Sequence, residues 1–119
     1  MNKYGNKSVE YLGEDFDSRA EKDRYLELLI LQKGGKLSNL RRQAKYELVP
    51  AGYGERAVTY TADFVYDVGD KTVVEDCKGF KTKDYIIKRK LFKQKFPDLV
   101  FSEICKGEFT KYSQFGGEY

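Results

Sequence analysis

Apolar and polar residues follow two different periods along this chain. Between Ser18 and Lys33 the apolar residues recur three and four positions apart, and Gly34-Gly35 ends the pattern, which predicts an amphipathic helix. Farther on, short runs of β-branched and aromatic residues between turn formers are typical of strands. The later elements predicted in this way are strands over residues 45–50, 57–66 and 72–78, a helix over 82–95 and a strand over 99–104.

This order of helix, three strands, helix and strand predicts one α/β domain with a mixed sheet flanked by helices. The final helix and strand are expected to form a crossover onto the sheet. We expect the core to span residues 18–105, preceded by an arm or short hairpin over 1–17 and followed by a flexible tail over 106–119. The basic stretch Arg41-Arg42-Gln43 is interpreted as the connection from the first helix to the sheet.

The composition limits the chemistry open to this protein. Its 119 residues suffice for one hydrophobic core, and no apolar run approaches the roughly 18 residues of a membrane helix. Because the start carries no apolar stretch of the signal-peptide kind, we expect a cytoplasmic protein. Histidine is absent, and Cys77 and Cys105 stand apart as expected core thiols, which excludes a zinc site and Ser-His or Cys-His catalysis. An enzyme of this composition works with carboxylates and lysines.

Positive charge is concentrated in one segment. The whole chain has a net charge of +3, yet residues 78–95 contain eight cations and one anion, Asp84. Aromatic residues are interleaved with these cations, a pattern expected for a surface that binds a polyanion such as nucleic acid. A solvated lysine-rich helix is the alternative interpretation. The candidate nucleic-acid contacts are Lys81, Lys83, Arg89, Lys90 and Lys93.

The end of the third predicted strand carries a candidate catalytic site. Successive side chains of a strand point to opposite faces, so Asp76 and Lys78 share one face, with Cα atoms about 6.6 Å apart. The preceding strand carries Asp63, and a hairpin turn around residues 67–70 can bring Asp63 beside Asp76. Two adjacent carboxylates suit Mg²⁺, and a nearby lysine can orient an attacking water. Surface charges on a sheet face are the alternative interpretation.

The first helix offers a third carboxylate. One stripe of this helix faces the sheet, and from it Glu21 can reach the two aspartates. Ser18 and Glu21 also fit a capping box, in which Glu21 returns a hydrogen bond to the backbone of Ser18. The two roles do not exclude each other. The stripe consists of Glu21, Tyr25, Leu28 and Gln32.

Four segments form a recognisable set in order along the chain: residues 3–7, 16–21, 60–66 and 74–83. Within them, Asp63, then Asp76-Cys77-Lys78 after a hairpin, and Glu21 on the preceding helix resemble the PD-(D/E)XK nuclease superfamily, whose restriction-endonuclease-like core has the order αβββαβ. More closely, the four segments together are similar to a family of small uncharacterised phage and prophage proteins grouped with endonucleases and Holliday-junction resolvase-like enzymes. The similarity runs from the first residues to about Glu103. Ala62 stands where the superfamily name has proline, at a position that varies.

The resemblance implies metal-dependent hydrolysis of nucleic-acid phosphodiesters. Lys78 would position or activate water, and Glu21 would bind the metal directly or through a water. The other ligands implied for Mg²⁺, with Mn²⁺ as a substitute, are Asp63, Asp76 and the backbone carbonyl of Cys77.

We therefore expect a Mg²⁺-dependent DNA endonuclease that acts on branched recombination or replication intermediates in a phage context, inside the bacterial host. Cutting both strands of a duplex would require two active sites, hence a homodimer. Neither an organic cofactor nor a membrane partner is expected. The alternative is a nucleic-acid-binding or adaptor protein with a nuclease-like fold and no turnover, and RNA stays open as a substrate. Whether Gln43 or Lys88 joins the site is also open.

Overall fold

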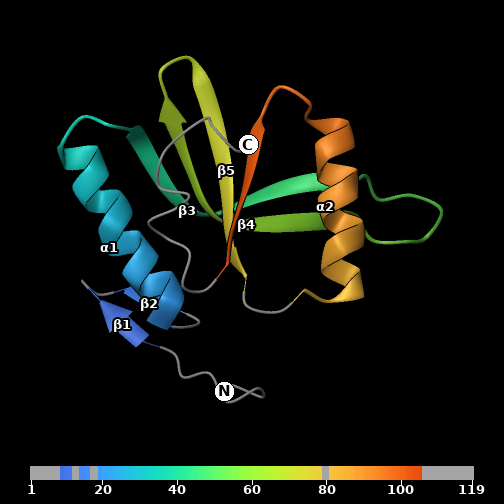
Figure 1. Cartoon of the computed structure of the whole chain (residues 1–119). Helices are drawn as coiled ribbons and strands as arrows, with labels where there is room; N and C mark the ends of the chain where they lie inside the picture. Colours follow the sequence, from blue (N-terminus) through green and yellow to red (C-terminus); the bar gives the residue numbers. More distant parts are fainter. Residues whose placement is uncertain (1–8, 12–13, 17–18, 79–80, 106–119) are drawn as a thin grey trace.

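The computed structural model describes residues 9–11, 14–16, 19–78 and 81–105 and shows an α/β fold (Figure 1). Two helices lie on opposite sides of a four-stranded mixed sheet, which confirms the expected architecture. None of the described helices is long and apolar enough to cross a membrane. In chain order the elements are β1 (Val9–Tyr11), β2 (Glu14–Phe16), α1 (Arg19–Lys33), β3 (Ser38–Val49), β4 (Val58–Val68), β5 (Lys71–Lys78), α2 (Lys83–Lys95) and β6 (Val100–Cys105).

The strand order of the sheet is β3-β4-β5-β6. The first three strands form an antiparallel meander, whereas β6 runs parallel to β5 because α2 carries the chain back across the sheet. The β4–β5 hairpin closes tightly, since Val68 pairs with Lys71 and Gly69 between them adopts a φ of 62° without strain. Separately, β1 and β2 form an antiparallel pair next to α1 (Figure 1).

Each helix covers one face of the sheet with its own hydrophobic cluster. Helix α1 buries Leu28 completely, but Ile30 is 71% exposed, because positions two apart lie on different sides of a helix. Both faces of β4 and β5 are covered, which explains why successive residues are buried over 64–66 in β4 and over 73–76 in β5. The α1 cluster consists of Leu28, Leu37, Phe64, Tyr66 and Val73, and the α2 cluster of Leu48, Tyr60, Ala62, Val65, Val74, Tyr85 and Phe92.

Strand β4 is kinked at Asp63. Alternate residues of a regular strand share a face, yet Ala62 packs in the α2 cluster and Phe64 packs in the α1 cluster. The strand therefore changes the face it presents at the residue between them. Gln43, which the β3–β4 register places opposite Asp63, has a φ of 54°, a conformation that non-glycine residues rarely adopt. Such backbone outliers concentrate at functional sites, which directs attention to this kink.

One predicted boundary is wrong. Strand β3 begins at Ser38 rather than at residue 45, so Arg41-Arg42-Gln43 lies within the strand and is not a connection. The strand occupies an edge of the sheet, and its residues alternate between exposed and partly buried positions. Charged residues are compatible with such an edge strand, so the two arginines are not evidence for a connection between elements.

The ends of both helices follow ordinary capping chemistry. Helix α2 begins after Thr82, whose side chain accepts a hydrogen bond from the N–H of Tyr85 at 3.1 Å. Helix α1 ends at Lys33, and just beyond it Gly35 adopts a φ of 80° while the N–H of Lys36 donates to the carbonyl of Leu31 at 2.9 Å. These caps define where each helix meets the sheet.

Candidate active site at the kink of the sheet

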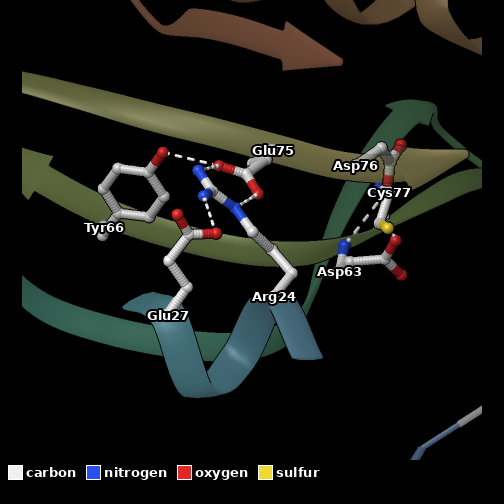
Figure 2. A network of polar contacts seen from close by, with 7 residues as sticks. All are labelled: Arg24, Glu27, Asp63, Tyr66, Glu75, Asp76 and Cys77. Atoms are coloured by element: carbon white, nitrogen blue, oxygen red, sulfur yellow. Dashed lines mark hydrogen bonds and ion pairs between the residues drawn. The ribbon is translucent and has the colours of Figure 1, made fainter. Parts of the chain in front are cut away.

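The two aspartates that were predicted to meet are adjacent at the kink of β4 (Figure 2). The regular β4–β5 pairing extends from the hairpin turn as far as Phe64 and Glu75. One position farther from the turn, hydrogen bonds to the side chains of Asp63 and Asp76 replace the backbone ladder. The N–H of Asp63 donates to Asp76 Oδ1 at 3.1 Å, and the N–H of Cys77 donates to Asp63 Oδ2 at 2.9 Å. The hairpin therefore brings the two aspartates side by side, as expected, with each carboxylate bonded to the backbone of the other strand.

Asp76 is completely buried, on the side of the sheet that α2 covers. Its second oxygen, Oδ2, accepts a hydrogen bond from the hydroxyl of Tyr60, a residue of the α2 cluster. Burial raises the pKa of Tyr60 far above its usual value, and the charge of Asp76 adds to this effect, so the phenol stays protonated and donates. Both oxygens of Asp76 thus have partners, as a buried carboxylate requires.

Glu21 reaches the same region from α1. Its side chain is buried, its Oε2 accepts a hydrogen bond from Gln43 Nε2 at 2.9 Å, and the Arg42 guanidinium lies 3.5 Å away. Because the β3–β4 register places Gln43 opposite Asp63, this bond holds Glu21 against the part of β3 that faces the aspartate pair. Gln43 therefore lies at the candidate site, a point that the sequence left open. Ser18 lies outside the described residues, and the capping role of Glu21 stays a prediction.

The three carboxylates do not surround one point. Glu21 approaches from α1, whereas the carboxylate of Asp76 contacts Tyr60 on the α2 side. Among the residues that the structure describes, no group of three or more acidic, histidine or cysteine side chains is placed to hold a metal ion. The side chain of Lys78 lies outside the described part, and its role as the water-positioning lysine stays a prediction. A metal at this site would depend on the Asp63–Asp76 pair.

A buried ion pair next to the aspartates was not predicted from the sequence. Arg24 and Glu75 are both fully buried, and the guanidinium donates to the two Glu75 oxygens at 2.6 and 2.9 Å (Figure 2). The hydroxyl of Tyr66 donates to Glu75 at 2.6 Å, and Glu27 accepts a further bond from Arg24 at 2.9 Å. Burial alone would lower the pKa of Arg24, but the bonds and charge of Glu75 outweigh it and keep the guanidinium charged.

This network joins α1 to the strand that carries Asp76. Arg24 lies one helical turn after Glu21, and Glu75 directly precedes Asp76 in β5. The burial of Arg24 could have been inferred from its spacing in the sequence. It lies three residues after Glu21 and four before Leu28, on the buried stripe of α1. The pair therefore sets how α1 sits on β5.

The predicted nucleic-acid contacts divide into two groups. Arg89 Nη1 donates to both oxygens of Glu103 at 3.0 Å, and Lys81 Nζ lies 4.0 Å from the same carboxylate, so these two cations are directed toward β6. Lys88 forms an ion pair with Asp84 one turn earlier at 3.7 Å. Among the side chains that the structure describes in this segment, the exposed cations are Lys83, Lys90, Lys93 and Lys95, and the ammonium groups of Lys93 and Lys95 also lie over the rings of Phe101 and Phe96.

The protein should lose stability steeply in alkaline solution. Burial raises the pKa of the Cys77 thiol to about 12. It also raises the pKa values of the Tyr60 and Tyr85 phenols far above the usual value of tyrosine. The unfolded chain releases the thiol proton above about pH 9 and the two phenol protons above about pH 10, while the folded chain retains them. Each such group then lowers the free energy of unfolding by about 1.4 kcal/mol per pH unit.

Urea unfolding at a series of pH values between 8 and 11 measures this loss. Tyr85→Phe serves as the matched variant, because it removes one of the three groups and should make the decline shallower by about one proton. A urea midpoint that stays level up to pH 11 would contradict the expected retention of these protons.

The sequence matches a known family over residues 1–114, nearly its whole length, and the description of that family is Protein of unknown function (DUF1064). No curated protein matches the chain. The family description assigns no chemistry.

Proposed function

We propose that this chain, which belongs to the family described as Protein of unknown function (DUF1064), is a metal-dependent endonuclease that hydrolyses phosphodiester bonds in DNA. The observation that carries the proposal is the direct contact of Asp63 with Asp76 at the kink of β4. Glu21 accepts a hydrogen bond from Gln43, which lies opposite Asp63 in the strand register, and Lys78 ends the same strand as Asp76. The positions of these four residues on α1, β4 and β5 support the proposal.

The donor atoms at the kink fit Mg²⁺ in kind and in number. Mg²⁺ binds hard oxygen ligands and is usually held by one or two carboxylates, with water and substrate phosphate completing its shell. Asp63 and Asp76 supply two carboxylates from adjacent strands. The contact between Asp76 and Tyr60 occupies one of these oxygens, so binding through Asp76 Oδ2 would require the phenol to turn away.

The chain's own residues suggest how the reaction would be divided. A divalent cation held by the aspartates would polarise the scissile phosphate and lower the pKa of a bound water. Lys78 would hold the attacking water and stabilise charge on the phosphate, as proposed from its position two residues after Asp76. The accessible lysines of α2, Lys83, Lys90 and Lys93, would hold the flanking backbone phosphates, since phosphate contacts supply most nucleic-acid affinity.

One observation favours a second candidate function. Asp76 is fully buried with both oxygens hydrogen-bonded, which is also what a purely structural aspartate would show. A protein with this arrangement could bind nucleic acid on a nuclease-like scaffold without cutting it. The two functions differ in whether the chain responds to divalent metal.

Cleavage and metal binding should be measured together. We expect wild-type protein to cut labelled four-way-junction, duplex or single-stranded DNA with Mg²⁺ or Mn²⁺ and to leave all of them intact in EDTA. Either metal should also raise the melting temperature of wild type but not of Asp63→Asn, because a ligand that binds the folded state stabilises it. RNA versions of the same substrates test the choice of nucleic acid.

The binding-only function predicts a different pair of results. The protein would bind the substrates without cutting them in the presence of either metal, and its melting temperature would not change with Mg²⁺ or Mn²⁺. A chain that neither cuts nor binds any of these nucleic acids would remove both proposals.

A further inference from the structure

The hairpin that joins β3 to β4 ends in a two-residue turn at Tyr53-Gly54. The N–H of Gly52 donates to the carbonyl of Glu55 at 3.1 Å, and the N–H of Glu55 donates back to Gly52 at 2.8 Å. Tyr53 and Gly54 between them have φ values of 54° and 78°. Two positive φ values in a two-residue hairpin loop are the signature of a type I′ turn.

Tyrosine is an unfavourable residue for the first position of this turn. Type I′ turns prefer asparagine, aspartate or glycine there, because a bulky side chain at positive φ is strained. The side chain of Tyr53 is also fully exposed, at 106% of its reference area. Neither the backbone nor the hydrophobic core therefore accounts for an aromatic ring at this tip, and strained positions of this kind tend to be functional.

The hairpin holds the ring at a fixed place away from the body of the protein. The loop projects past α2 in Figure 1, and β3 and β4 stay paired up to Val49 and Val58. Tyr46 packs against Phe92, with ring centroids 5.1 Å apart, and Lys95 Nζ donates to the carbonyl of Glu47 at 2.8 Å. These contacts anchor the arm to α2, so that the ring has a defined position relative to the lysines of that helix.

We propose that Tyr53 stacks on an unpaired or terminal base of the nucleic-acid substrate. This inference rests on the proposed function and deepens it by naming the structure that the protein recognises. An exposed aromatic ring can stack on any base, because every base offers a π-face, and such a contact selects for unpaired bases rather than for sequence. Exposed Arg56 and Lys95 flank the hairpin with positive charge, which suits the phosphate next to that base.

The chain limits how far the ring can lie from the candidate active site. Tyr53 and Asp63 are ten positions apart, which allows at most about 33 Å between them in a fully extended chain. A substrate that reaches both therefore extends at most about ten nucleotides from the cut, since each strand of DNA advances about 3.4 Å per nucleotide. Stacking at this distance would place a branch or a strand end at a defined separation from the scissile bond.

The test measures binding in EDTA, where cleavage does not interfere. Tyr53→Ala should weaken binding to a four-way junction and to a forked duplex by roughly 5- to 150-fold, the range of one base–aromatic stack. Tyr53→Phe is the matched control and should bind like wild type. A relaxed, covalently closed duplex circle has no unpaired or terminal base, and its binding should be the same for all variants.

A second variant separates recognition from stability. Tyr53→Asn should raise the melting temperature, because asparagine tolerates positive φ and Asn-Gly is a preferred type I′ pair, while it weakens binding as Tyr53→Ala does. If Tyr53→Asn lowers the melting temperature and leaves junction binding unchanged, the tyrosine is structural and the inference is wrong. Equal junction binding by wild type and Tyr53→Ala would overturn the inference and leave the nuclease proposal standing. Failure of wild type to bind any nucleic acid would remove both.

Discussion

Asp63→Asn should abolish metal-dependent cleavage while leaving the fold intact. Removing one of two carboxylates lowers the affinity for a divalent cation and with it the stabilisation of the phosphate, a loss of several kcal/mol or about 10³-fold in rate. The asparagine carbonyl can still accept the hydrogen bond that the N–H of Cys77 donates at 2.9 Å to Asp63. We therefore expect the free energy of unfolding in the absence of metal to change by no more than about 1 kcal/mol.

Single-turnover cleavage rates and urea unfolding curves of the same preparations check both halves of this expectation. Asp84→Asn is the matched control, because Asp84 is exposed on α2 and pairs only with Lys88 among the contacts described for it. That variant should cut at the wild-type rate. Cleavage by Asp63→Asn within tenfold of wild type would exclude Asp63 from the catalytic set.

The position of this aspartate could be predicted because local rules determine it. Strand alternation and the length of the β4–β5 hairpin together define the register, and the register determines that Asp63 and Asp76 meet. The order of helices and strands was predictable for the same reason, since each element is long enough to show its own period. These features required no knowledge of how the helices pack.

The features that were missed depend on packing between distant elements. The kink at Asp63 arises where the strand passes from the α2 cluster to the α1 cluster, and no local pattern marks that change. It also decides that Asp76 contacts Tyr60, on the side opposite Glu21, so the third carboxylate does not join the pair directly. Strand periodicity alone could not show which helix would cover which end of β4.

Arg24 illustrates the same limit for charged residues. An arginine in an amphipathic helix is normally interpreted as solvent-facing, because burial of an unpaired charge is costly. Its partner, Glu75, lies 51 positions later, and no spacing rule within one element connects them. The burial of both residues is compatible only with their pairing, which the tertiary fold creates.

Arg24→Met should destabilise the protein by about 3–5 kcal/mol at neutral pH. The substitution leaves Glu75 buried without its countercharge, and breaking one partner of a buried pair costs about this much. A domain of this size has a total stability of only about 5–15 kcal/mol, so the variant should be close to unfolding at physiological temperature. Urea unfolding monitored by circular dichroism measures the change.

The matched control is Arg41→Met, because Arg41 forms an exposed ion pair with Asp67 at 3.5 Å and its loss should cost less than about 1 kcal/mol. The double variant Arg24→Met with Glu75→Met removes both charges and should recover at least half of the lost stability, since apolar groups of similar volume often replace a buried ion pair without penalty. Suppose that the double variant regains stability and still shows no metal-induced rise in melting temperature. That result would mean that the Arg24–Glu75 pair positions α1, and with it Glu21, relative to the strand that carries Asp76. A single variant as stable as wild type would instead mean that the Arg24–Glu75 pair does not hold α1 against the sheet.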